Sequence, residues 1–245
     1  MEREAQIRDI EQRYGFTLRL PSPDCSSAKG LTVLLGGAAI HVSEYESTIR
    51  VLVDEKQYAV IAFNRLVPRF FRDFFNGKTH EAMARDVVGS VTEVMQLFPF
   101  LGEQYCLVGH SVGGKVALLV ASKYEQPAHR VKTVLALDPV DGNPLEFTCN
   151  PVAVPLQNSH AALHLTLAEV SSSGSPEGQN AEAIRKACTD PSAISSFTVH
   201  RGAGHLCCTD HGGGWLAWAV VHPKGEAHEN ERAKANAHDM IRKLL

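Results

Sequence analysis

The stretch CLVGHSVGGKVALLVAS, residues 106–122, places an apolar run before a serine framed by glycines and a helix-forming run after it. Its centre, GHSVG, is a G-x-S-x-G pentapeptide, and Ser111 lies where a buried strand is expected to pass into a helix. Such a tight turn requires glycine two positions away on each side, because side chains there would collide. The pentapeptide recurs by chance in unrelated chains, but this context favours a nucleophilic serine.

Strand-like and helix-like segments alternate along the rest of the chain. The expected strands lie at 31–37, 57–64, 104–110, 131–138, 162–170 and 195–201, and most of them are apolar runs without alternation. The expected helices lie at 44–56, 79–98, 113–125, 181–188 and 229–245. Non-alternating strands separated by helices indicate an α/β fold with a mostly parallel central sheet and helices on both faces.

The length and the glycine-rich segments bear on domain organisation. A chain of 245 residues suits one α/β domain. We expect a single domain over 1–245, with residues 1–30 as an N-terminal extension packed on it. The segment SSSGSPEGQN at 171–180 is predicted to be a loop, and HGGGW at 211–215 a flexible link before the last helix.

The composition excludes several classes of function. The formal net charge is −3 and the basic residues are scattered, so nucleic acid is not an expected partner. No apolar run approaches the ~20 residues that cross a bilayer. Six cysteines in this length are not a disulfide framework, so we expect reduced thiols and an intracellular location. The first fifteen residues mix acidic and basic side chains, unlike a targeting segment.

A nucleophilic serine needs an orienting acid and a base, in the order serine, acid, histidine. Asp138 ends an expected strand, Asp141 lies in the turn behind it, and Glu169 follows the next strand. We favour Asp138, because the carboxyl ends of parallel strands meet at the edge of the sheet where the serine also lies. Asp141 fits a turn-forming role beside proline and glycine, and Glu169 remains the alternative.

His205 is the expected base. It lies in the glycine-flanked loop GAGHLCC after the last strand, which can return an imidazole over the serine. His211 is the nearest rival but follows the strand by a longer loop. His200 lies within the strand pattern, and His110 is expected to point away from the site.

Two backbone amides are predicted to form an oxyanion hole. One is the N–H of Val112, directly after the serine, and the other is the N–H of Ala38 in LLGGAAIH, the loop after the first core strand. Gly36 and Gly37 would let this loop approach closely, although they also suit an ordinary turn at the end of a strand.

The segment NRLVPRFFRDFFNGK, residues 64–78, carries four phenylalanines at helical spacing, Phe70, Phe71, Phe74 and Phe75. One interpretation is that this aromatic face packs on the core. The other is that it lines an apolar substrate pocket or touches a lipid surface near the serine.

Together these motifs resemble the α/β-hydrolase superfamily and, within it, the chlorophyllase family. GGAAIHVSEY is similar to the family's H-G-F segment and following tyrosine, which aligns Gly37 and Tyr45. GHSVGGK resembles G-H-S-R-G-G-K, LDPVDG matches the strand-end acid motif, and SPEGQN and GAGHLCC are similar to C-A-P-E-G-x-N and the G-H-M-D loop. Val112, Gly36 and Ala38 depart from the family's arginine, histidine and phenylalanine.

The resemblance implies the α/β-hydrolase fold and a triad of Ser111, Asp138 and His205. It implies that the substrate is a small molecule with a bulky apolar ester: either chlorophyll, which would give chlorophyllide and phytol, or another bulky ester or thioester. It also implies that the reaction needs no cofactor and no protein-bound metal. It also implies Gly37 in the substrate pocket, peripheral contact with a membrane, and a plastid or cytoplasmic location. A non-catalytic binding protein on the same fold is the alternative from another class.

Overall fold

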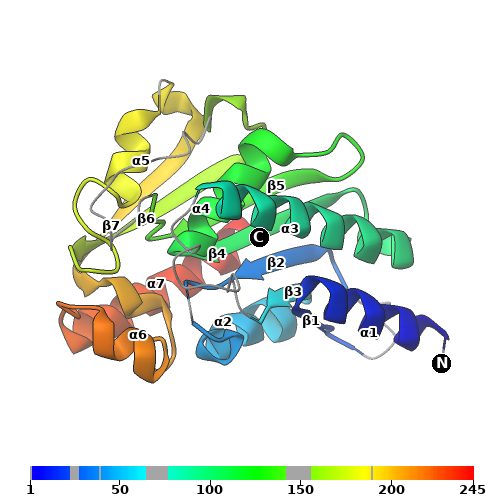
Figure 1. Cartoon of the computed structure of the whole chain (residues 1–245), viewed down its shortest axis with the longest axis horizontal. Coiled ribbons are helices and arrows are strands. Elements are labelled where there is room, and N and C mark those ends of the chain that lie inside the picture. Colours follow the sequence, from blue (N-terminus) through cyan, green and yellow to red (C-terminus); the bar gives the residue numbers. More distant parts are fainter. Residues whose placement is uncertain (1, 23–27, 39, 65–76, 142–155, 189) are drawn as a thin grey trace.

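The structure, a computed structural model, describes residues 2–22, 28–38, 40–64, 77–141, 156–188 and 190–245. Its centre is a seven-stranded sheet in the order β1-β3-β2-β4-β5-β6-β7 (Figure 1). The strands are β1 Phe16–Arg19, β2 Leu31–Leu35, β3 Ala59–Phe63, β4 Gln104–His110, β5 Arg130–Leu137, β6 Ala162–Val170 and β7 Ile194–Gly204. Strand β1 is antiparallel to β3, and the other neighbours pair in parallel. The predicted fold class is confirmed.

Helices cover both faces of the sheet (Figure 1). They are α1 Glu2–Tyr14, α2 Glu46–Arg50, α3 Gly77–Leu97, α4 Val112–Leu119, α5 Ala181–Ala187, α6 Gly214–Val220 and α7 Ala227–Leu244. Buried side chains of α1, α3, α4 and α5 belong to the core on one face, and those of α2, α6 and α7 to the core on the other. Neighbouring strand residues such as Leu107 and Val108 enter opposite cores, which explains the lack of apolar alternation.

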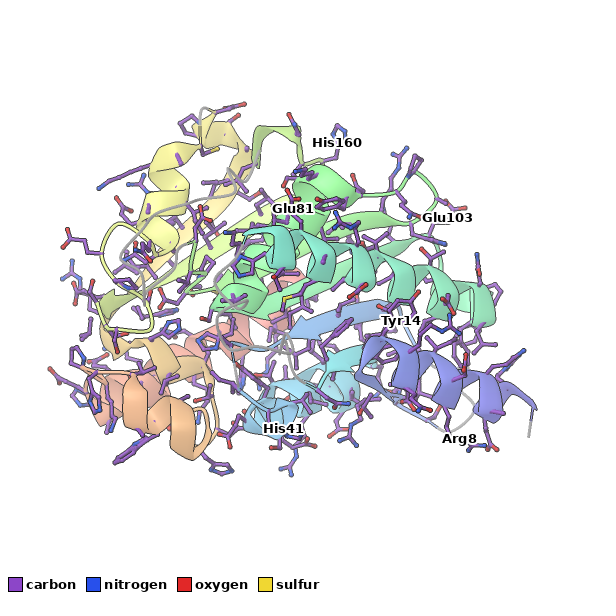
Figure 2. The ribbon with its side chains drawn as sticks, viewed as in Figure 1. Arg8, Tyr14, His41, Glu81, Glu103 and His160 are labelled. Carbon is purple, nitrogen blue, oxygen red and sulfur yellow. The ribbon has the colours of Figure 1, made fainter. Side chains whose placement is uncertain are left out.

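The N-terminal residues contribute two elements that the sequence pattern does not indicate. Helix α1 packs against α3, where the hydroxyl of Tyr14 (labelled in Figure 2) donates to Glu93 at 2.8 Å. Strand β1 then extends the sheet, with Phe16 buried against Phe63 at a ring-centroid distance of 5.8 Å. This segment is therefore packed on the domain, and its strand is part of the sheet.

Two other segments differ from expectation. The predicted helix over 44–56 is divided into a 3₁₀ turn at Val42–Tyr45, helix α2, and a π-helical turn at Val51–Glu55. The glycines of HGGGW do not form a simple link, because Gly213, at φ 79°, directly precedes the short helix α6. Glycine adopts this left-handed conformation without a steric penalty, so it suits the position directly before the helix.

The described residues include no helix that is both long enough and apolar enough to cross a membrane. Cys106 lies in β4 and is buried.

Candidate active site

Ser111 lies in the sharp turn between β4 and α4, with φ 56° and ψ −127°. This is a sparsely populated conformation for a residue with a side chain. A Cβ atom on Gly109 would lie 2.3 Å from the carbonyl oxygen of Gly113, and one on Gly113 would lie 2.3 Å from that of Leu35. Both glycines are therefore required by close backbone approach, and that approach leaves the serine at the carboxyl edge of the sheet.

His205 begins a short 3₁₀ turn, His205–Cys208, directly after β7. Its Nε2 lies 2.9 Å from Ser111 Oγ, and its Nδ1 lies 2.6 Å from Asp138 Oδ2. With Nδ1–H donating to the carboxylate, Nε2 is left to accept the serine hydroxyl. All three residues are at least 96% buried, since their exposed fractions are 4%, 3% and 1% for Ser111, His205 and Asp138.

Asp138 follows β5 with a positive φ of 40°. Its own N–H donates to the carbonyl of Thr166 at 3.1 Å. Its second carboxylate oxygen, Oδ1, accepts from the Ala168 N–H at 3.2 Å. Each oxygen therefore has a partner, and these contacts hold the carboxyl where it fixes the orientation of His205.

The alternative acids have other partners. Asp141 forms a buried ion pair with Lys115, with 2.5 Å between Oδ1 and Nζ. Glu169 accepts a hydrogen bond from the N–H of Gly202 at 2.9 Å on the exposed side of β6. The structure thus brings Asp138, and neither alternative, to the imidazole.

The other histidines considered as bases lie elsewhere. His211 is exposed, and its N–H donates to Glu44 Oε2 at 3.0 Å. His200 is buried within β7, as the strand pattern predicts. Neither is hydrogen-bonded to Ser111 among the bonds of the described residues.

His110 takes part in a hydrogen-bonded chain beside the site, which the sequence did not reveal. The Gly37 N–H donates to the Tyr45 hydroxyl at 2.8 Å, and that hydroxyl lies 2.7 Å from His110 Nδ1. His110 Nε2 lies 2.8 Å from the carbonyl oxygen of His205, so Nε2 carries the proton and Nδ1 accepts from the tyrosine. This relay connects the loop after β2 with the loop that carries His205.

The relay is maintained by a neutral imidazole. Burial, followed by the nearby His205, lowers the pKa of His110 to about 3. Burial also raises the pKa of the Tyr45 hydroxyl above its usual value. Both groups are therefore uncharged near neutral pH, and each keeps a fixed donor or acceptor role.

Acid should destabilise the fold through His110. The unfolded chain takes up this proton near pH 6.5 and the folded chain only near pH 3, so the contribution is fully present above pH 6.5 and is lost as the pH falls toward 3. Between pH 7 and pH 5 the loss is on the order of 2 kcal/mol. Urea unfolding at both pH values should show a smaller loss in a His110→Gln variant.

Burial also lowers the pKa of other histidines, namely His164, His200 and His238. These titrate alike in both proteins, so the difference between wild type and variant isolates His110. An equal loss of unfolding free energy in the two proteins would contradict the assignment.

The predicted oxyanion loop lies directly against the serine. A Cβ atom on Gly37 would be 3.2 Å from Ser111 Cβ. Since the Gly37 N–H is used by Tyr45, the next amide, that of Ala38, remains the predicted donor from this loop. Val112 is the first residue of α4, where helical N–H groups have no partner within the helix. The four phenylalanines predicted to line the pocket, Phe70, Phe71, Phe74 and Phe75, lie outside the described residues.

Comparison with known proteins supports the fold. No protein-family model matches the sequence, and no curated protein matches it. Esterase PE8 superposes with a TM-score of 0.61 at 13% identity, over 94% of this chain and 99% of that one. The dienelactone hydrolase from Anabaena variabilis superposes with a TM-score of 0.58 at 15% identity, over 93% of this chain and 90% of that one. The Pyrococcus horikoshii acylaminoacyl peptidase superposes with a TM-score of 0.65 at 14% identity, but the match covers only 39% of that longer chain.

The chain has the α/β-hydrolase fold. In this fold the nucleophile follows a central strand and the acid and histidine follow later strands, which is the order of Ser111, Asp138 and His205 here. The likeness to these structures extends to the fold, and the narrower resemblance to chlorophyllases remains a hypothesis.

Sequence reasoning missed three residues that surround this candidate site. Tyr45 was aligned by resemblance without a role, and His110 was only expected to point away from the site. Lys115 was included in the predicted helix at 113–125 without a role of its own. Its single charge within the apolar sequence GGKVALLV could have indicated a buried lysine that needs a partner. A lysine in an apolar helix is rarely buried without a partner, and the structure supplies one in Asp141.

Proposed function

We propose that the protein is a serine carboxylic-ester hydrolase with Ser111 as nucleophile, His205 as general base and Asp138 as orienting acid. The hydrogen-bonded chain from Ser111 Oγ through both nitrogens of His205 to Asp138, at 2.9 and 2.6 Å, carries this proposal. Solved structures with the same fold include proteins named as an esterase and a dienelactone hydrolase, which favours an ester as the bond that is cleaved.

Acylation begins when Ser111 Oγ attacks the ester carbonyl and His205 Nε2 takes the hydroxyl proton. The negative charge that develops on the carbonyl oxygen is stabilised by the N–H groups of Ala38 and Val112. Asp138 keeps Nδ1 protonated and stabilises the imidazolium. The intermediate then collapses, His205 gives its proton to the leaving alcohol, and the acyl group stays on Ser111.

Deacylation repeats these steps with water. His205 takes a proton from the water as its oxygen attacks the acyl carbonyl, and the proton passes to Ser111 Oγ when the acid product leaves. The scheme uses no cofactor and no metal ion.

The proposed substrate is a bulky apolar ester, with chlorophyll as the first candidate. The chlorophyllase-like segments GGAAIHVSEY, LDPVDG and SPEGQN support this choice, and the acid and alcohol products would be chlorophyllide and phytol. The phenylalanines of residues 64–78 would line the apolar pocket or contact a membrane that holds such a substrate. A plastid or cytoplasmic location belongs to this proposal.

Activity-based labelling together with a substrate panel tests the proposal. A fluorophosphonate probe should label the wild type and not Ser111→Ala, because only an activated serine reacts with it. Hydrolysis rates should be compared on chlorophyll, on short and long p-nitrophenyl esters, and on acyl-CoA. Release of chlorophyllide and phytol supports the pigment substrate, whereas turnover of the other esters alone would leave an ester hydrolase and remove chlorophyll. Absence of both labelling and turnover would indicate a binding protein.

A further inference from the structure

Lys115 is a buried charge within the helix that follows the serine. Only 1% of its side chain is exposed, and it stands one turn after Ser111, whose carbonyl accepts its N–H at 3.2 Å. The neighbouring residues of α4 are apolar or glycine, and they are buried as well. An ammonium group in such surroundings is costly unless it is paired.

Its partner is Asp141, three residues after the proposed orienting acid. Lys115 Nζ lies 2.5 Å from Asp141 Oδ1, and 9% of the Asp141 side chain is exposed. Burial raises the pKa of this carboxyl, and the adjacent Lys115 opposes the rise. The pair therefore joins α4 to the turn that follows β5.

Three further contacts join Ser111 and α4 to the end of β5 and the turn after it. The Ser111 N–H donates to the carbonyl of Leu137 at 3.0 Å, and the Val140 N–H donates to the carbonyl of Ser111 at 3.2 Å. Pro139 packs so closely on α4 that a Cβ atom on Gly114 would lie 2.9 Å from its Cβ. These three contacts involve the backbone of at least one partner, whereas the ion pair joins two side chains and can be changed by substitution.

Both residues that this junction connects have strained backbones. Ser111 has φ 56° and Asp138 has φ 40°, and neither is glycine. Such conformations persist only where the surrounding structure holds them, and they cluster at functional sites. A restraint on both sides of the junction is therefore needed to keep the serine, the imidazole and the carboxylate in register.

We infer that Lys115 and Asp141 are positioning residues, whose buried ion pair fixes the turn carrying Asp138 against the helix that follows Ser111. This inference rests on the proposed function. A buried ion pair contributes geometry more reliably than stability, because an apolar pair of similar volume often supports the fold equally well. A double apolar replacement should therefore restore stability without restoring geometry, which distinguishes a positioning role from a purely structural one.

The test compares Lys115→Met, Asp141→Leu and the double variant on an ester that the wild type hydrolyses. Each single variant leaves one buried group without its partner, so both the melting temperature and kcat should fall. The double variant should regain most of the melting temperature, while its kcat stays about 10- to 100-fold below wild type with KM little changed, because small displacements of catalytic groups are costly. Recovery of kcat together with the melting temperature overturns the inference.

A second variant covers the case in which the double variant does not regain stability. Asp141→Asn keeps the shape of the side chain and removes its charge. Measured well below its melting temperature and normalised to folded protein, its kcat should be lower by about tenfold or more. A value within about twofold of wild type overturns the inference.

Lys123→Met is the matched control. Lys123 follows α4 and pairs with Glu81 on α3, but its side chain is 43% exposed (Figure 2 labels Glu81). Loss of this exposed pair should leave kcat unchanged. Wild-type protein that neither reacts with the fluorophosphonate nor hydrolyses any ester would refute the proposed function, whereas an active wild type with a fully active double variant refutes only the positioning role.

Discussion

Replacing Ser111 by alanine should lower the rate of ester hydrolysis by about 10⁴–10⁶-fold. The variant removes the attacking oxygen, and His205 Nε2 then has no hydroxyl 2.9 Å away from which to take a proton. The fold should survive, because alanine is smaller than serine and the turn depends on Gly109 and Gly113. Initial rates and circular dichroism on the same preparation measure both effects.

Ser122→Ala provides the control for this experiment. Ser122 is also a buried serine, and its hydroxyl donates to the carbonyl of Leu118 at 2.6 Å within the helical segment that continues α4. Its replacement should preserve the rate to within about a few-fold, because the hydroxyl bonds only a helical carbonyl. Substantial ester hydrolysis remaining in purified Ser111→Ala would exclude Ser111 as the nucleophile.

Asp138→Asn should lower kcat by about 10⁴-fold. An asparagine amide can donate to His205 Nδ1, which favours the tautomer with the proton on Nε2, and that nitrogen can then no longer accept from Ser111. Asp141→Asn should cost much less, because Asp141 acts on the position of the acid and does not contact the imidazole. Stopped-flow or steady-state rates at saturating substrate measure the difference.

Glu169→Gln completes this comparison. Its carboxylate bonds the Gly202 N–H, and a glutamine oxygen can still accept that bond, so activity should be preserved. A loss at position 141 or 169 that equals or exceeds the loss at 138 would overturn the assignment of the acid.

Local patterns were sufficient to predict the elbow and the sheet. The elbow motif spans five positions. The glycine requirement at position 109 follows from backbone contacts within that turn, whereas Gly113 is required by close approach to the backbone of Leu35 and Gly36. Most of the buried strands are also visible in the sequence, because a strand covered on both faces is mainly apolar, as β2 and β3 are. The seven-stranded architecture was therefore largely visible in the sequence.

The choice among the acids could not be made from the sequence alone. Asp138 and Asp141 share one strand-end turn, and only contacts with distant residues distinguish them. His205 reaches Asp138, whereas Lys115 reaches Asp141. The strand β1 was missed for a similar reason, since four residues are too short to show a period and their pairing with β3 is set by tertiary structure.

The relay through Tyr45 and His110 has a consequence for chimeras built by recombining sequences that share this fold. Its members come from three segments, the loop after β2, the end of β4 and the loop after β7, so no single crossover fragment short of most of the domain contains them all. A donor sequence that supplies phenylalanine at position 45 leaves the Gly37 N–H and His110 Nδ1 without their shared hydroxyl. The three segments therefore have to be inherited as one unit, even though they are far apart in the gene.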